Sequence, residues 1–339
     1  MVYAQIAEAY GASEEARKLH VFARTSAFTK TAYDPYVNIL RTTTEAFSGV
    51  VGGVDAMEVA TLDEPFGSSE ELTRRIARNI QVMMQEEFHL TQPVDPAGGS
   101  WYVETLTAQL AESIWAYFQN IESKGGIILS GTLQDDVAAT LAQRFKNLDT
   151  RADRAVGVNM YANVLEQKLD RPAPKAVPAP AGPAVVTAKP IEAHRWTERY
   201  EALRAQTEAW MEKTGKTLDV FLANMGPIPQ HKARADFAAG FFEVAHFNML
   251  RNDGFPTVDA CADAAVKSGA PVVVICSTDA TYPEIVPELA RKIKAAKPDT
   301  TVLLAGAPAP EYKDAYLEAG VEDFIHVKAN CYDILSKIQ

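Results

Sequence analysis

The stretches 271–276, PVVVIC, and 301–305, TVLLA, decide the fold of the C-terminal part of this sequence. Neither stretch alternates apolar with polar residues, which indicates strands that are buried on both faces of a parallel sheet. Two further candidate strands lie at 219–223 and 323–327. Helical patterns separate these strands, so the order of elements predicts a doubly wound α/β sheet.

The helices of this region are expected at 233–245, 283–296, 311–319 and 332–338. Successive β/α steps of this kind are typical of a flavodoxin-like domain. In such domains ligands bind beyond the carboxyl ends of the strands. The candidate ligand-binding segments are therefore the loops at 224–230, 277–282 and 306–310.

A Pro- and Ala-rich stretch at 171–190, RPAPKAVPAPAGPAVVTAKP, precedes this region. Proline fixes φ and removes a backbone donor, so the stretch is predicted to be an extended tether with a domain on either side. The predicted division is a first domain at 1–165, a linker at 166–195, a connecting helix at 196–216 and a second domain at 217–339.

The N-terminal region is predicted to consist of long helices with a few short strands between them. A helix is expected over 34–50, ended by Gly52 and Gly53, with strands at 20–26 and 54–60. Further elements are expected as helices at 68–90, 102–122 and 135–148 and as a strand at 156–159.

The helix expected at 68–90 carries a candidate core-facing stripe. Its apolar residues recur every four positions, at Leu72, Ile76, Ile80 and Met84. Short strands between long helices form the rhythm of an α/β barrel, but a closed (β/α)8 barrel needs eight strands in roughly 250 residues. The predicted fold class is therefore α/β, with a partial TIM (β/α)8-barrel segment followed by the flavodoxin-like doubly wound domain.

The composition restricts what the protein binds. A net charge of −11 over 339 residues argues against nucleic acid and against an anionic membrane surface. No stretch approaches the ~20 apolar residues of a membrane span, and residues 1–10 do not resemble a signal peptide. Cys261, Cys276 and Cys331 form no metal-binding pattern and are expected to be buried apolar residues of a cytoplasmic protein.

Several blocks of the N-terminal region resemble the late barrel of the methylmalonyl-CoA mutase family. They read DPYVNILRTTTEAFSGVVGGVDAMEV from Asp34, LDEPFGSSEELTRRIARNIQVMMQEE from Leu62, VDPAGGSWYVETLT from Val94 and GVNMY from Gly157. The resemblance extends over 20–161, and a linker followed by a flavodoxin-like, cobalamin-binding-type domain is also the family's arrangement. It implies a part in the adenosylcobalamin-dependent rearrangement of acyl-CoA thioesters, typically of succinyl-CoA to methylmalonyl-CoA, in propionate metabolism.

The loop that would hold the cofactor departs from the family pattern. Catalytic members carry Asp-x-His-x-x-Gly, in which the His is the lower cobalt ligand, the Asp orients it and the Gly makes room for the corrin. Here residues 225–234 read MGPIPQHKAR. If the Met-Gly pair sets the register, Gln230 takes the ligand position. If His231 sets it, Pro229 and Arg234 replace the Asp and the Gly, so the triad is broken in either register.

Other positions that the resemblance assigns to the cofactor also differ. Ser277 stands in Cys-Ser-Thr where the family has Ser-x-Leu, and alanine follows Gly306 where the family has Gly-Gly. In the barrel, Arg24 replaces a Gln that lies near the adenosyl group, and the Glu of a Ser-Leu-Thr-Glu stretch is missing from 27–30. Glu64 does match the family.

The resemblance therefore implies the small, non-catalytic subunit of a heterodimeric mutase. The partner would be the catalytic large subunit, and it would bind both the adenosylcobalamin and the acyl-CoA. This chain would belong to an isomerase complex without a catalytic residue or a cofactor of its own. The alternative is a catalytically competent mutase with His231 as the cobalt ligand. Without that role, His231 is expected to be a surface or helix-capping residue, and Asp63 and Glu64 are expected to cap a helix or close a strand–loop junction.

Overall fold

The computed structural model describes residues 1–167, 169 and 190–339, so nearly all of the predicted tether at 171–190 lies outside the described residues. The described chain is an α/β protein with parallel sheets, as predicted. It divides into two compact units, an N-terminal unit around Met1–Gln143 and a unit around Trp196–Gln339 that we call the sheet unit. The sheet unit also includes Arg144–Lys168, which the sequence analysis placed mainly in the first domain.

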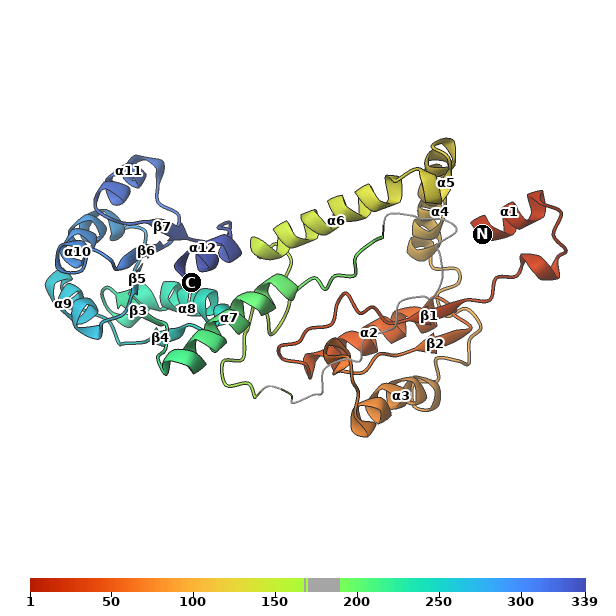
Figure 1. Ribbon diagram of the computed structural model, residues 1–339, viewed down its shortest axis with the longest axis horizontal. Coiled ribbons are helices and arrows are strands. Elements are labelled where there is room, and N and C mark those ends of the chain that lie inside the picture. The colour runs from red at the N-terminus through yellow and green to blue at the C-terminus, as the bar shows by residue number, and fades with distance from the viewer. Residues whose placement is uncertain (168, 170–189) are drawn as a thin grey trace. The chain divides into compact units, whose positions relative to one another are not determined.

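The sheet unit contains a five-stranded parallel sheet in the order β4-β3-β5-β6-β7 (Figure 1). The strands are β3 (Asp219–Asn224), β4 (Asn248–Leu250), β5 (Val272–Cys276), β6 (Thr301–Ala305) and β7 (Asp323–Ile325). The four predicted strands are confirmed, and β5 is buried at every residue. The edge strand β4 is missed by the sequence pattern, because its three partly exposed residues form no apolar run.

The helices of the sheet unit are α7 (Glu198–Thr214), α8 (Ile228–Phe242), α9 (Val258–Ser268), α10 (Tyr282–Ala296), α11 (Pro310–Glu318) and α12 (Cys331–Ile338). Helix α8 begins earlier than the predicted residue 233. Pro227 is its N-cap and Pro229 lies in its first turn. Proline is tolerated there because the first N–H groups of a helix have no helical partner to lose. The prolines that favoured a loop therefore fit the start of a helix.

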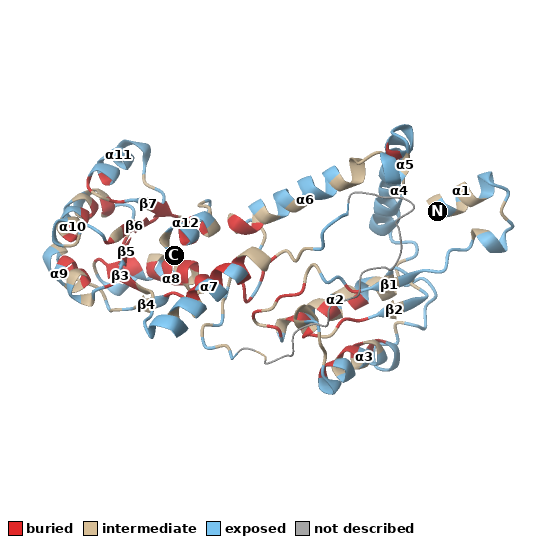
Figure 2. Cartoon of the chain, viewed as in Figure 1, coloured by how far each residue is buried: buried red, intermediate tan, exposed pale blue. Residues whose placement is uncertain are grey.

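Buried residues concentrate in this sheet and in the helices that pack on it, drawn red in Figure 2. Val273 of β5 and Val286 and Leu289 of α10 are fully buried in one apolar cluster. The loops at the carboxyl ends of the strands are therefore held in place by a closely packed core.

The N-terminal unit contains two parallel strands, β1 (Phe22–Arg24) and β2 (Ala56–Glu58), with Ala23 opposite Met57. The helices along this part of the chain are α1 (Val2–Ala9), α2 (Val37–Val51), α3 (Glu71–Glu86), α4 (Trp101–Ser123), α5 (Gly126–Leu129) and α6 (Thr132–Asp149). Short 3₁₀ turns lie at η1 (Glu15–Arg17), η2 (Glu64–Phe66) and, in the sheet unit, η3 (Glu243–Ala245). The strand predicted at 156–159 is wrong, because Val156 forms only an isolated bridge to Met160.

Helix α3 buries a different stripe from the predicted one. Ile80 and Met84 are buried as expected, but Leu72 is 63% exposed. Thr73 and Ala77 complete the buried face instead. A helix has 3.6 residues per turn, so positions spaced strictly by four drift around the axis and cannot all face one core.

No helix in the described ranges is both long and apolar enough to cross a membrane. The three cysteines are free and buried, as predicted. Among the described residues, no group of three or more His, Cys, Asp or Glu side chains is arranged to hold a metal ion.

Candidate functional site

Ser277 lies directly after β5, at the carboxyl edge of the sheet, and is 1% exposed. Its hydroxyl donates to the Met225 carbonyl oxygen at 3.1 Å and accepts from Thr281 Oγ1 at 2.8 Å. Its backbone N–H donates to Tyr282 Oη at 3.1 Å, and Tyr282 Oη donates to the Ala305 carbonyl oxygen at 2.6 Å. The hydroxyl and the N–H of Ser277 thus both donate to groups of the chain itself. Through these bonds and Tyr282, the residue connects the carboxyl ends of β3, β5 and β6.

His231 lies in the first turn of α8 and is 3% exposed, so its interpretation as a surface residue is wrong. The ring Nδ1 lies 3.0 Å from the Gly226 carbonyl oxygen. A carbonyl oxygen only accepts, so Nδ1 carries the proton and Nε2 of the neutral ring is the acceptor nitrogen. A backbone carbonyl therefore orients this imidazole, whereas Pro229 at the Asp position offers no carboxylate.

Gln230 occupies the ligand position in the other register, and its side chain folds over Gly226. A Cβ atom placed on Gly226 would lie 2.1 Å from Gln230 Oε1. Gly226 has a φ of +82°, which favours glycine. Replacement of this glycine would therefore both strain the loop and expel the Gln230 amide.

Arg234 reaches across the loops from α8 and closes the carboxyl edge of the sheet. Its Nη2 lies 2.8 Å and 3.1 Å from the two carboxylate oxygens of Asp279. A Cβ atom placed on Gly306 would lie 3.5 Å from Arg234 Cζ, 3.5 Å from Asp279 Oδ1 and 3.3 Å from the Tyr282 ring. The space over Gly306 is therefore lined by an ion pair and a tyrosine of the chain itself.

These three positions do not fit the cobalamin site that the resemblance implies. Among the described residues His231 has no carboxylate partner, the Arg234 guanidinium stands beside Gly306, and Ser277 is held by internal hydrogen bonds. Burial raises the pKa of Tyr282, which keeps its hydroxyl protonated and donating to Ala305. The arrangement can hold the loops together, and its polar groups are largely satisfied without a ligand.

In the N-terminal unit, Arg24 joins the carboxyl ends of both strands. Arg24 Nε lies 3.1 Å from Glu58 Oε1, and its Nη2 donates to Glu64 Oε1. The hydrogen bond that Arg24 donates to Glu58 raises the pKa of Arg24. Arg24, which the resemblance places near the adenosyl group, is thus paired with two carboxylates. One of them is Glu64, the residue that matches the family.

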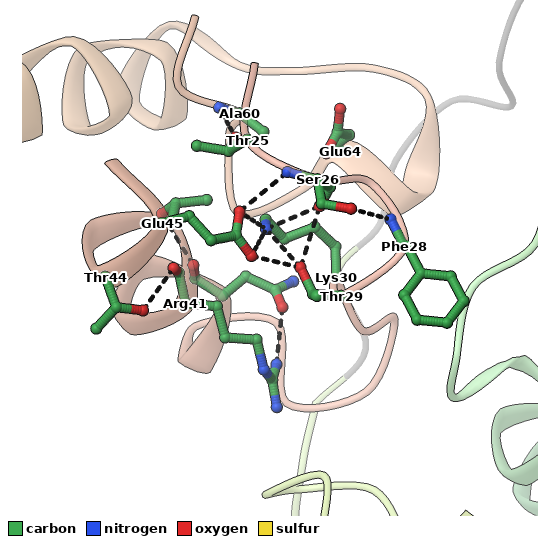
Figure 3. Close-up of polar contacts among 12 residues, drawn as sticks. Thr25, Ser26, Phe28, Thr29, Lys30, Arg41, Thr44, Glu45, Ala60 and Glu64 are labelled. Carbon is green, nitrogen blue, oxygen red and sulfur yellow. Dashed lines mark hydrogen bonds and ion pairs between the residues drawn. The ribbon is translucent and has the colours of Figure 1, made fainter. Parts of the chain in front are cut away.

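Lys30 and Glu45 form a second charged pair, which the sequence analysis did not find. Lys30 is fully buried, and its Nζ lies 2.7 Å and 2.9 Å from the two oxygens of Glu45 on α2 (Figure 3). The same ammonium group donates to the Ser26 carbonyl oxygen at 2.9 Å and to Thr29 Oγ1 at 3.0 Å. Burial lowers the pKa of Lys30, although Glu45 opposes this shift. The positions are 15 residues apart in different elements, so no local spacing could have signalled the pair.

Asp63 joins the loop after β2 to the start of α3, whose N-cap residue Glu70 makes no side-chain capping bond. The side chain is fully buried, and its Oδ2 accepts from the Glu70 N–H at 3.3 Å and from Thr73 Oγ1 at 3.0 Å. Glu70 is the N-cap residue of α3 and Thr73 lies in its first turn, so these bonds hold the loop against the start of the helix.

The fold and these loops define a class of protein: a two-unit α/β protein with a parallel sheet whose carboxyl edge is occupied by its own side chains. The chain belongs to the methylmalonyl-CoA mutase family, whose model matches residues 1–221.

Curated relatives agree with this assignment. The methylmalonyl-CoA mutase small subunit of Porphyromonas gingivalis is 35% identical over 98% of this chain and 53% of its own length. The small subunit of Streptomyces virginiae is 37% identical over 95% of this chain and 51% of its own. That of Propionibacterium freudenreichii is 32% identical over 87% of this chain and 45% of its own. The chain thus spans about half the length of the curated relatives it matches.

Proposed function

We propose that this chain acts as the small, non-catalytic subunit of an adenosylcobalamin-dependent methylmalonyl-CoA mutase and does not itself bind cobalamin. In this proposal residues 1–165 are the late part of a TIM barrel. The C-terminal domain is flavodoxin-like, and the strand order β4-β3-β5-β6-β7, with its second strand at the edge, supports that description.

The observation that carries the proposal is the Arg234–Asp279 ion pair beside Gly306. A doubly wound domain binds its ligand at this edge of the sheet. A bulky cofactor would have to displace the ion pair and the Tyr282 ring, and it would find no carboxylate-held imidazole in return. These contacts support a C-terminal domain whose sheet edge does not hold a corrin.

The proposed partner is a catalytic large subunit, which would bind the adenosylcobalamin and the acyl-CoA. The names of the similar small subunits support a heterodimer, and so does the exposed apolar surface of the N-terminal unit. Permanent complexes bury large, apolar interfaces. Coexpression with a large subunit that carries an intact Asp-x-His-x-x-Gly motif is expected to give a stable complex, and separate elution of the two chains would contradict the partnership.

Cobalamin binding is tested by titrating the chain with hydroxocobalamin and recording the visible spectrum. We expect no stoichiometric binding and no spectral shift, whereas a mutase subunit with the intact motif, measured in parallel, gives both. Tight binding with histidine coordination would overturn the non-binding role.

The alternative function, a competent mutase with His231 as the lower cobalt ligand, is favoured by one observation. The Gly226 carbonyl oxygen fixes the ring so that Nε2 is an acceptor, the form in which imidazole binds metals. If this alternative holds, His231→Ala abolishes cobalamin binding and Gln230→Ala leaves it intact. Equal behaviour of the two variants would exclude it.

A further inference from the structure

A cavity of about 350 Å³ lies in the sheet unit between the loop 151–162 and helix α8. Its charged lining residues are the arginines Arg151, Arg154 and Arg251 and the acids Asp236 and Glu243. The cavity is separate from the carboxyl-edge site, because neither Ser277 nor Gly306 lines it. Its volume lies in the range of sites for small molecules.

The wall formed by the loop is fixed by a buried asparagine. Asn159 is fully buried, and its Nδ2 donates to the carbonyl oxygens of Leu148 at 3.0 Å and Asp153 at 2.9 Å. Its Oδ1 accepts from the Ala155 N–H at 2.7 Å. Asn159 belongs to the GVNMY block, so this block builds the wall of a cavity. A wall held in this way needs little ordering when a ligand binds.

Two arginines give the cavity its unbalanced charge. Arg151 Nη2 donates to the Gly240 carbonyl oxygen at 2.6 Å, and its buried Nε has no hydrogen-bond partner. Arg154 is exposed and forms no ion pair within the described residues. Arg251, by contrast, is neutralised by Glu243 at 2.7 Å. Asp236, the other acid of the lining, pairs with Lys232 at 3.0 Å, so the charge left over in the cavity is positive and suits an anion.

The rest of the lining is largely apolar, with Met160 from the loop and Phe237 from α8. The loop holds two non-glycine residues with left-handed backbone, Arg151 at a φ of +57° and Tyr161 at +55°. Such residues are uncommon and concentrate at functional sites. Both line the cavity, so the unusual backbone places side chains at this one site.

We propose that this cavity binds a small organic carboxylate with a compact apolar body. The carboxylate would pair with the exposed Arg154, with the positive charge of Arg151 beside it, and the apolar body would pack on Met160 and Phe237. A bare inorganic anion would leave the apolar lining without a contact, and a neutral analogue would leave the guanidinium groups without a counterion. The proposal goes beyond the function in the mutase and does not rest on it.

The experiment is a calorimetric titration of the full chain with benzoate as the probe. Arg154→Gln is the test variant, because the residue is exposed and the change should not affect folding. Arg291→Gln is the matched control, because Arg291 is an exposed arginine of α10 outside the cavity. We expect one benzoate site, a loss of affinity of roughly tenfold or more in Arg154→Gln from the lost charge-assisted bond, and unchanged affinity in Arg291→Gln.

Two further probes separate the parts of the proposal. Benzamide keeps the shape of benzoate without its charge, and inorganic phosphate keeps the charge without the apolar body. Both are expected to bind at least roughly tenfold more weakly than benzoate. The proposal fails if benzoate does not bind, if the two arginine variants bind it equally, or if either probe matches it.

Discussion

Helix α10 of the sheet unit and helix α4 of the N-terminal unit are both rich in apolar residues, yet they differ completely in burial. Helix α10 has 15 residues, of which five are buried: Tyr282, Val286, Leu289, Ala290 and Ile293. Helix α4 has 23 residues and buries only Ile121 (Figure 2). Apolar content alone therefore does not bury a helix, because burial also needs a surface to pack against.

The exposed side chains of α4 are of the kind that proteins normally cover. They include Trp101 at 90% exposure, Leu110 at 53% and Ile114 at 56%. Apolar patches of this extent mark interaction surfaces. Within the described residues, α4 therefore presents an apolar surface of the kind that a protein partner covers.

The comparison is tested most strongly by the same substitution in both helices. Leu289→Ala is expected to destabilise the sheet unit by about 4 kcal/mol, because it removes a fully buried leucine and leaves a cavity. Leu110→Ala is expected to change the stability of the N-terminal unit by less than about 0.5 kcal/mol, because Leu110 is already exposed. Denaturant unfolding, followed by hydrogen exchange in each unit, measures both changes.

A large loss of stability in Leu110→Ala would show that α4 is packed within this chain, and the contrast would then be wrong. Addition of a large subunit provides the control. If α4 forms the interface, Leu110→Ala should weaken binding of the large subunit. Leu289→Ala should leave the contacts at that interface unchanged.

The fold of the sheet unit could be predicted from the sequence because its strands carry their own signal. The runs at 271–276 and 301–305 match β5 and β6 to within one residue. Strand β4 could not be found, since its place at the sheet edge depends on pairing with β3 and not on its composition. The start of α8 was hidden for a different reason, because prolines fit both a loop and a first helical turn.

The site was harder to predict than the fold. The resemblance drew attention to His231, Ser277 and Gly306, but the Arg234–Asp279 pair that lies beside them joins positions 45 residues apart. The burial of His231 was missed because its basic neighbour Lys232 suggested a surface, whereas successive helical residues point in different directions. Contacts of this type follow from the folded arrangement and have no local sequence pattern.

The next prediction concerns how each unit holds its charges. Glu45→Ala leaves the fully buried Lys30 ammonium without its carboxylate and is expected to destabilise the N-terminal unit by about 3 kcal/mol. In the sheet unit, Asp279→Ala breaks a solvent-exposed pair and is expected to cost less than about 1 kcal/mol. Urea unfolding of the two variants gives the comparison, and similar losses in both would show that burial of the pair does not set its contribution.

The two units should also respond to alkaline pH with opposite sign, and this effect should be smaller than that of deleting Glu45. Burial lowers the pKa of Lys30 below 10.5, so the unfolded chain binds more protons between the lowered value and 10.5, and stability rises with pH there. Burial raises the pKa of Cys331 from 9.0 to about 11, so its contribution to the sheet unit is complete below 9 and is lost as pH rises toward 11. The free energy of unfolding is measured from pH 8 to 11. Its increase with pH in the N-terminal unit should disappear in Lys30→Met, and its decrease with pH in the sheet unit should become smaller in Cys331→Ala. Unchanged slopes in both variants would contradict the assignment.

The smallest expected difference lies at the helix starts. In the sheet unit, Thr257 caps α9, because its side chain accepts from the Ala260 N–H at 3.3 Å. In the N-terminal unit, Ser100 stands at the N-cap of α4 but makes no side-chain capping bond. Thr257→Ala should therefore cost about 1 kcal/mol, whereas Ser100→Ala should be close to neutral. Thermal unfolding resolves this difference. Ser100→Ala could reduce stability only when the large subunit is present. This result would mean that the partner completes the cap, and the contrast between the two helices would then include their hydrogen bonds as well as their packing.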